Sequence, residues 1–526
     1  LPSGHILSHA SADETAVPND FDPNTPYDLT KVDLSDIESW SHQWVNNTNE
    51  EMYCSAHVLD ANGNVFELGG HSGLKPTEGV DYIYGKDQAA LFDFESKSWI
   101  QQPSMNQARW YPTAVTLGNG DVLAIGGTHG TDQENIFKPE VFDGSSWRIL
   151  ENVSYDNRLV NDNDFDHIYP FVHLVSDGRV FWAGWDNNMA YIDTAGDGAW
   201  GPNHVREGTT RPWGTPVMYR QDKLLLIGGM GIDEGVYNYW HSTDTAQVVD
   251  LTSDEPESRY TNPMWFPRTD TDSTILANGD IWVNGGSYIH TLNEENPTLI
   301  RMSELWNPDT EEWRLTAPAT NPRGYHSSSL LLPSGQVWTG GGECGIGCDL
   351  GMTAQVFNPP YLFKQDGSGQ LADRPTINSV EEQITYGQKF SANISADGDV
   401  SKLTFIRLGS TTHHINFEQR YLELDFTQTD NNLLITAPEH GNIAPPGFYM
   451  LFAFDSSGVP SIAQMVQILP AEDMTWEPVT TTDNSQPTER HESAYVEKDG
   501  KFYLMGGRGS RPIEMFDPIS KTWLNL

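Results

Sequence analysis

The sequence is short of basic residues and of long apolar runs, and each shortage excludes a class of protein. Of 526 residues, 30 are Lys or Arg and 73 are Asp or Glu, which gives a formal net charge of −43. A field of that sign repels DNA, RNA and anionic membranes, so we exclude nucleic-acid and membrane binding. No run of 18 apolar residues occurs, and a transmembrane helix is therefore not expected. The opening residues LPSGHILSHA do not have the pattern of a secretion signal, which would have been removed before this numbering starts.

Cysteine is also scarce, with three residues in the chain. Cys344 and Cys348 are close enough in sequence for one small-loop disulfide, which leaves Cys54 as the odd one. An odd cysteine is either a small buried apolar residue or a reactive, covalently modified one. Glycine (47), proline (32) and tryptophan (17) are abundant instead, a composition that favours turn-rich β structure over disorder.

A short apolar strand ending in paired glycines recurs along the chain. The clear copies are VFELGG (65–70), VLAIGG (122–127), LLLIGG (224–229), IWVNGG (281–286) and VWTGGG (337–342), and the decayed ones are ILSHAS (6–11) and VFWAGW (180–185). Their spacing is near the kelch period of roughly 50 residues, at which each repeat forms one four-stranded propeller blade. Seven copies predict a seven-bladed kelch β-propeller over residues 1–365.

The glycine pairs stop after NPPYLF (358–363), and a different pattern follows. Residues 374–469 contain short alternating strands, which predict an immunoglobulin-like β-sandwich. Residues 471–526 contain FYLMGG (502–507), one more kelch unit that does not continue the seven in register. A single blade cannot bury its faces alone, so this unit either begins a second propeller or docks on the first. The expected fold class is all-β.

Four segments carry a resemblance to a known family. They are MYCSAHVLDANGNVFELGG (52–70), MNQARWYPTAVTLGNGDVLAIGG (105–127), NPRGYHSSSLLLPSGQVWTGGGECGIGC (321–348) and LGSTTHHINFEQRYLEL (409–425). Occurring together and in this order, they resemble the galactose oxidase/glyoxal oxidase family of copper-radical oxidases over roughly residues 1–469.

This resemblance implies one copper ion and a radical made from the protein's own residues. Tyr111 would be an equatorial copper ligand joined by a thioether bond to Cys54, and Tyr325 would be the axial ligand and proton acceptor. The residue types suit the chemistry, because oxidising an alcohol or hydrated aldehyde removes two electrons while copper accepts one. A phenol touching the metal can store the second electron equivalent, and nitrogen and oxygen ligands suit Cu(II). A second tyrosinate can take the substrate proton.

Two histidines would complete the copper site. The resemblance assigns His326, next to the axial tyrosine, and His413 of the fourth segment. His414 adjoins His413 and makes the register ambiguous, and the QR pair at 419–420 favours His413. The pair Cys344–Cys348 would be the family's small disulfide.

Departures from the family pattern bear on the substrate. Galactose oxidase has a Trp after the second glycine pair that stacks on the cross-linked tyrosine, and here GGTHG places His129 there. Residues 167–184, HIYPFVHLVSDGRVFWAG, look more like the glyoxal oxidase branch, in which small aldehydes are oxidised as hydrates. We therefore expect small aldehydes or primary alcohols as substrates, with O2 consumed and H2O2 released. Candidate pocket residues are His129, Tyr169 and Trp110, whose alternative role is ordinary packing between blades.

Two functions from different classes remain open at this stage. The first is a copper-radical oxidase, of glyoxal oxidase or galactose oxidase type, and the second is a catalytically silent kelch protein that binds carbohydrate. The intact set of five site residues favours the oxidase. A disulfide, copper and peroxide production together favour a secreted or extracytoplasmic location. The sequons at Asn46, Asn152 and Asn393 could carry glycans only on a eukaryotic secretory route.

Overall fold

The structure is a computed structural model, and the following description covers the residues that it places. These are residues 1–8, 31–37, 39, 41–46, 54–71, 75–77, 80–82, 85–129, 138–154, 168–208, 210–231, 241–289, 298–342, 353–471, 481–483, 485–490, 493–498, 501–506, 511–517 and 520–526. The predicted disulfide residues Cys344 and Cys348 lie outside them. The chain divides into two compact units, Leu1–Ala471 and Glu472–Leu526.

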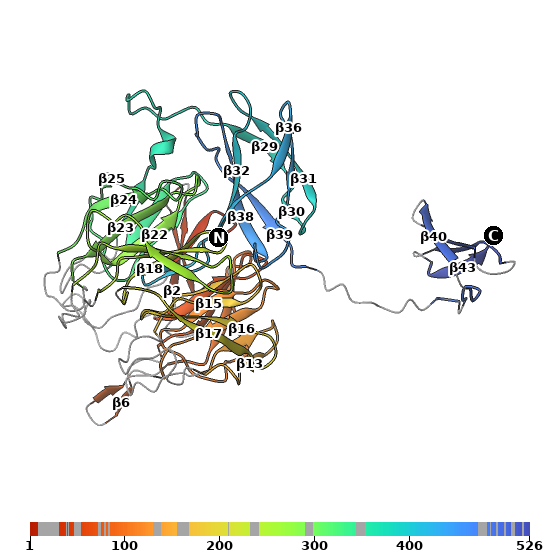
Figure 1. The fold of residues 1–526 in the computed structure, drawn as a ribbon, viewed down its shortest axis with the longest axis horizontal. Coiled ribbons are helices and arrows are strands. Elements are labelled where there is room, and N and C mark those ends of the chain that lie inside the picture. Colours follow the sequence, from red (N-terminus) through yellow and green to blue (C-terminus); the bar gives the residue numbers. More distant parts are fainter. Residues whose placement is uncertain are drawn as a thin grey trace. The chain divides into compact units, whose positions relative to one another are not determined.

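In the first unit, small antiparallel sheets follow one another along the chain, and each strand generally pairs with the next (Figure 1). Sheet by sheet, their strands are β1 (His5–Ser8), β2 (Lys31–Asp36) and β3 (His42–Asn46); β4 (Ser55–Leu59), β5 (Val65–Gly69), β8 (Ala89–Asp93) and β9 (Ser98–Gln102); β10 (Thr113–Thr116), β11 (Val122–Ile125), β12 (Glu140–Phe142) and β13 (Trp147–Ile149); β14 (Val172–Leu174), β15 (Val180–Trp182), β16 (Asn188–Asp193) and β17 (Ala199–Val205); β18 (Thr215–Arg220), β19 (Lys223–Ile227), β20 (Ala246–Asp250) and β21 (Glu257–Tyr260); β22 (Thr269–Ile275), β23 (Ile281–Ser287), β24 (Met302–Trp306) and β25 (Trp313–Pro318); and β26 (Ser327–Leu331), β27 (Val337–Gly341) and β28 (Ala354–Phe357). A two-stranded ribbon, β6 (Lys75–Thr77) with β7 (Val80–Tyr82), lies between β5 and β8 in sequence.

The glycine-pair motifs mark the second strand of the four-stranded sheets, as in β5, β11, β19 and β23. A tight turn precedes these strands, and before β5, β11 and β23 its glycine has a positive φ, +84° at Gly63, +94° at Gly120 and +94° at Gly279, whereas Asp222 takes that position before β19 with φ of 55°. Only glycine adopts that conformation without steric cost, so the turn chemistry sets where each hairpin reverses. The all-β prediction is confirmed for the described residues, in which the only helical element is the single 3-10 turn η3 (Pro360–Leu362).

Successive sheets contact each other through their first strands. The Thr215 hydroxyl of β18 lies 2.9 Å from the Ser273 hydroxyl of β22, and Thr113 of β10 donates to the Pro170 carbonyl at 2.9 Å. These side chains are buried, and buried polar groups need hydrogen-bond partners, which the neighbouring sheet supplies here. The first strands therefore form the centre around which the sheets are arranged.

A buried arginine recurs at the start of these sheets, a signal that the sequence analysis did not use. The guanidinium donates to the carbonyl of the first glycine of the pair, from Arg109 to Gly126 (2.9 Å), Arg211 to Gly228 (2.8 Å), Arg268 to Gly285 (2.6 Å) and Arg323 to Gly341 (2.9 Å). Two of these arginines also form ion pairs with third-strand carboxylates whose side chains are 0% exposed, Glu140 and Glu304. A buried charge is tolerated only when it is paired and hydrogen-bonded, so each arginine ties three segments of its sheet together.

The sandwich that follows has two sheets over one apolar core. One sheet contains β29 (Thr376–Val380), β31 (Lys389–Ser395), β37 (Asn432–Thr436) and β36 (Phe426–Thr429); the other contains β30 (Gln383–Ile384), β39 (Gln464–Ile468), β38 (Gly447–Phe454), β32 (Lys402–Arg407) and β35 (Tyr421–Glu423). A small hairpin, β33 (Thr411–Thr412) with β34 (Ile415–Asn416), projects between β32 and β35 in sequence.

The second unit is one four-stranded sheet, β40 (Ser493–Lys498), β41 (Lys501–Gly506), β42 (Glu514–Asp517) and β43 (Thr522–Asn525). It repeats the arginine arrangement, because Arg490 donates to the Gly506 carbonyl and forms a buried ion pair with Glu514. Across both units, no helix among the described residues is long and apolar enough to cross a membrane.

Candidate active site

One backbone position recurs in six sheets and defines the site. Fifteen residues before the fifth position of each motif (Gly69, Gly126, Gly184, Gly228, Gly285 and Gly341), the chain has a non-glycine residue with positive φ: Cys54 (58°), Tyr111 (63°), Tyr169 (41°), Trp213 (58°), Asp270 (57°) and His326 (66°). Residues other than glycine rarely adopt this backbone conformation, and those that do cluster at active sites. The backbone amide of Tyr111 donates to the Cys54 carbonyl at 3.1 Å, and that of Tyr169 to the Tyr111 carbonyl at 2.9 Å. These equivalent residues therefore follow each other around the centre of the sheets.

Four side chains from this centre and from the sandwich converge. The Tyr325 hydroxyl donates to the Tyr111 hydroxyl at 3.0 Å, and both rings are buried. The His413 ring lies 4.9 Å from the Tyr111 ring and 4.5 Å from the His326 ring, measured between centroids. The structure thus brings together four residues that are as far apart as 302 positions in sequence.

His413 reaches this point on a strained turn. His413 and His414 are the two central residues of the β33–β34 hairpin, with φ of 51° and 61°. A turn with positive φ at both central residues normally uses Asn and Gly, so two histidines here cost conformational energy. Burial of both rings, 6% and 1% exposed, shows that surrounding contacts hold the turn in place.

Cys54 and the predicted pocket residue Tyr169 lie in the same buried cluster as Tyr111. The Tyr169 ring is 4.9 Å from the Tyr111 ring and 4.4 Å from the His413 ring. Its hydroxyl donates to the Ser55 carbonyl at 3.0 Å, next to Cys54. Since Tyr169 is 1% exposed, it packs behind the site and holds the Cys54 segment there.

The residue that precedes Tyr111 in sequence, Trp110, also contacts its ring. Trp110 makes an edge contact with Tyr111 at 4.6 Å, and it is half-buried. His129 is also half-buried, but in the described part of the chain no ring contact joins it to Tyr111. Of these two predicted pocket residues, Trp110 is therefore the one whose ring contacts Tyr111.

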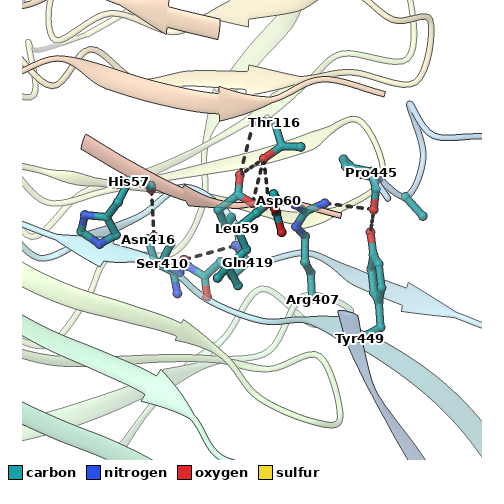
Figure 2. A network of polar contacts seen from close by, with 12 residues as sticks. His57, Leu59, Asp60, Thr116, Arg407, Ser410, Asn416, Gln419, Pro445 and Tyr449 are labelled. Atoms are coloured by element: carbon teal, nitrogen blue, oxygen red, sulfur yellow. Dashed lines mark hydrogen bonds and ion pairs between the residues drawn. The ribbon is translucent and has the colours of Figure 1, made fainter. Parts of the chain in front are cut away.

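The His413 hairpin is held by hydrogen bonds to the first strands of several sheets (Figure 2). The Ser410 hydroxyl donates to the His57 carbonyl of β4 at 2.8 Å, and His57 Nε2 lies 3.1 Å from the Thr411 carbonyl. Burial lowers the pKa of His57 to about 4, so its ring is neutral and donates to that carbonyl. On the other side, Gln419 accepts from the Ile275 amide of β22 at 2.8 Å.

A buried ion pair reinforces this attachment. Arg407 at the end of β32 lies 2.7 Å from Glu418, and their side chains are 3% and 4% exposed. Arg407 also donates to the Leu59 carbonyl of β4 at 3.2 Å, and Thr116 of β10 donates to Glu418 at 3.1 Å (Figure 2). The sandwich therefore places His413 through charged and polar contacts that end on two different sheets.

The converging side chains suit a copper ion. Two imidazoles and two phenols supply the nitrogen and oxygen donors that Cu(II) favours, and the two phenol oxygens meet at one point. Residues Tyr111, Tyr325, His326 and His413 are the group that could hold the metal.

Comparisons with known proteins found similar oxidases. Residues 374–468 match the family "Galactose oxidase-like, Early set domain". A galactose oxidase of Gibberella zeae is 31% identical over 452 residues, which are 81% of this chain and 62% of the relative. Aldehyde oxidase GLOX1 of Arabidopsis thaliana is 27% identical over 511 residues, 85% of this chain and 78% of the relative. A fungal alcohol oxidase of the AA5 family, solved in complex with copper, superposes with a TM-score of 0.74 at 27% identity, over 84% of this chain and 90% of that one.

These relatives differ in how much of them the chain covers. The chain spans 62% of the length of the galactose oxidases that it matches. Identity is higher to the galactose oxidases, while the plant aldehyde oxidases are matched over more of their length. Assignment to the glyoxal oxidase branch therefore stays a prediction.

Proposed function

We propose that this chain belongs to the galactose oxidase/glyoxal oxidase family of copper-radical oxidases and is itself a copper-radical oxidase, which its similarity to galactose oxidases, to plant aldehyde oxidases and to a copper-containing fungal alcohol oxidase supports. The observation that carries the proposal is the meeting of the Tyr325 and Tyr111 hydroxyls at 3.0 Å beside the His326 and His413 rings. Random core residues from two domains do not converge as two phenols and two imidazoles.

We also propose a specific architecture for the all-β fold, a kelch propeller followed by an immunoglobulin-like sandwich. The sheets from β1 to β28 would be the seven blades of a kelch propeller within residues 1–365, and residues 374–469 would be an immunoglobulin-like sandwich. Contacts between successive first strands and the recurring arginine support the blades. Residues 471–526 would be a further kelch-like blade, supported by the same arginine arrangement at Arg490.

Each site residue has a chemical role in this proposal. Tyr111, Tyr325, His326 and His413 would hold one copper ion, which supplies one of the two electron acceptors that alcohol oxidation needs. Tyr111, joined to Cys54 by a thioether bond, would store the second oxidising equivalent on its ring. Tyr325 would take the hydroxyl proton of the substrate, since a tyrosinate is a base. The electrons leave with O2, which is reduced to H2O2.

Burial suits this radical chemistry. Cys54 is 2% exposed and Tyr111 is 7% exposed, so water reaches an oxidised ring poorly. Trp110 covers one side of Tyr111 and would slow its reduction by solutes.

We propose small aldehydes as hydrates, or primary alcohols, as substrates, with Trp110 and His129 at the pocket. The strongly acidic chain would repel acidic sugars and leave neutral substrates unaffected. Copper, peroxide and the proposed Cys344–Cys348 disulfide favour an extracytoplasmic location.

The test is peptide mass spectrometry after the apoprotein is incubated with Cu(II) and air. We expect the Cys54 and Tyr111 peptides to become one species that has lost two hydrogens, and Tyr111→Phe to abolish it. Tyr191→Phe is the matched control, because Tyr191 lies in the same buried cluster but its hydroxyl donates to the Ser253 carbonyl at 2.9 Å rather than to the Cys54 segment, so the link should still form. H2O2 release would then be screened with glyoxal-type aldehydes, primary alcohols and galactose. If both peptides stay separate in the wild type, the oxidase proposal fails and a binding scaffold is the better description.

A further inference from the structure

The interface between strands β22 and β26 contains two side-chain hydrogen bonds of different chemistry. Thr274 and Ser329 contact through their hydroxyls at 2.6 Å, an ordinary neutral pair. Two residues nearer the site, the Ser327 hydroxyl donates to the Asp272 carboxyl at 2.8 Å. Both bonds join the same two strands, so pairing of the strands does not by itself require a carboxyl at residue 272.

Ser327 connects two segments of the site. It directly follows His326 in sequence, and its backbone carbonyl accepts from the His414 amide at 3.1 Å. His414 is the neighbour of His413 on the strained hairpin turn. Movement of Ser327 would therefore displace both histidines of the candidate metal site at once.

Asp272 is an expensive residue at this place. It is 0% exposed, its Oδ1 atom has no hydrogen-bond partner, and its cross-strand partner Asn284 has neither amide atom satisfied. Burial raises the pKa of Asp272 to about 7. Unsatisfied buried polar groups destabilise a fold, so a serine or threonine, as at Thr274, would make the same contact at lower cost. A carboxyl provides what a hydroxyl lacks, a strong acceptor that fixes the direction of the Ser327 hydroxyl.

We propose that Asp272 is a positioning residue, which acts through Ser327 to hold His326 and the His413 hairpin in the geometry that binds the metal. The inference rests on the proposed function, because it assigns Asp272 a role toward the copper ligands. Groups behind metal ligands typically change metal affinity by about 10–100-fold when they are removed.

The experiment compares Cu(II) binding and the Cu(II) EPR spectrum of purified full-length variants. Ser327→Ala and Asp272→Ala should bind Cu(II) about 10–100-fold more weakly and show altered EPR parameters. Asp272→Asn keeps an oxygen acceptor for the Ser327 hydroxyl and should retain the wild-type spectrum. Ser329→Ala, the matched control, removes the neighbouring bond between the same strands and should change neither quantity.

Thermal unfolding of the apoproteins separates folding from metal binding. If Asp272→Ala does not fold, Ser327→Ala carries the test, because it deletes one oxygen atom. Wild-type binding by Ser327→Ala, or an equal change in Ser329→Ala, would overturn the inference while leaving the proposed function standing. A wild-type protein that binds no Cu(II) would instead overturn the proposed function, and the inference with it.

Discussion

Replacing Glu418 by Gln should destabilise the first unit by about 3 kcal/mol. The substitution preserves the shape of the side chain and removes the charge that faces Arg407 at 2.7 Å. Removing one partner of a buried ion pair typically costs about 3–5 kcal/mol, because the remaining charge stays buried without compensation. Arg407 keeps two acceptors, the carbonyls of Pro445 and Leu59, so we expect the lower end of that range.

Urea unfolding followed by tryptophan fluorescence measures this loss as a shift of the midpoint. Asp254→Asn is the control, since Asp254 also pairs with an arginine, Arg179 at 2.6 Å, but is 84% exposed. An exposed pair contributes at most about 1 kcal/mol, so the control should shift the midpoint little. Equal shifts for the two variants would refute the claim that Glu418→Gln leaves a buried, uncompensated charge on Arg407.

The same experiment has a readout at the site. Glu418 lies five residues after His413 and anchors that hairpin to Thr116. We expect Glu418→Gln to weaken Cu(II) binding as well as folding, measured by competition with a chelator. Unchanged Cu(II) affinity together with lower stability would show that the hairpin keeps its position without the ion pair.

Three further outcomes follow from buried groups elsewhere. Burial raises the pKa of Glu67 from 4.5 to about 8, so the free energy of unfolding should fall as pH rises between those values, and Glu67→Gln should flatten the dependence in urea midpoints taken at pH 5 and 8. A Cβ at Gly441 would lie 1.7 Å from the Gly118 carbonyl oxygen, so Gly441→Ala should cost about 1–3 kcal/mol in thermal unfolding, and no loss would contradict this close approach. Tyr169→Phe leaves the Ser55 carbonyl without its 3.0 Å donor and should cost about 1 kcal/mol by the same measurement, a prediction that wild-type stability would contradict.

Much of the fold was predictable because its signals are local. Strand alternation depends on neighbouring residues, and turn glycines such as Gly63 and Gly120 mark where each hairpin reverses. The break between the repeats and the sandwich was visible as the end of the glycine pairs. The buried arginines were a missed signal, since Arg109, Arg211 and Arg268 each lie 17 residues before the first glycine of a pair, and Arg323 lies 18 residues before.

The candidate ligands were found only through the resemblance. Nothing in the immediate sequence around Tyr111, Tyr325 or His413 shows that they meet, because their proximity depends on closure of the sheets and on a loop from another domain. Which rings contact Tyr111, such as those of Trp110 and Tyr169, likewise depends on side-chain directions that the sequence does not contain.

By itself, the sequence determined the β strands, the hairpin turns, the repeat length and the list of residues that could carry redox chemistry. Tertiary structure alone decided that residues from separate sheets share one backbone position with positive φ, that Arg407 and Glu418 attach the His413 hairpin, and that Asp272 contacts Ser327. The physical reason is the distance along the sequence over which the deciding interactions act. Alternation and turns are set by interactions over a few residues, whereas contacts between Asp272 and Ser327, 55 residues apart, form only when whole sheets pack together.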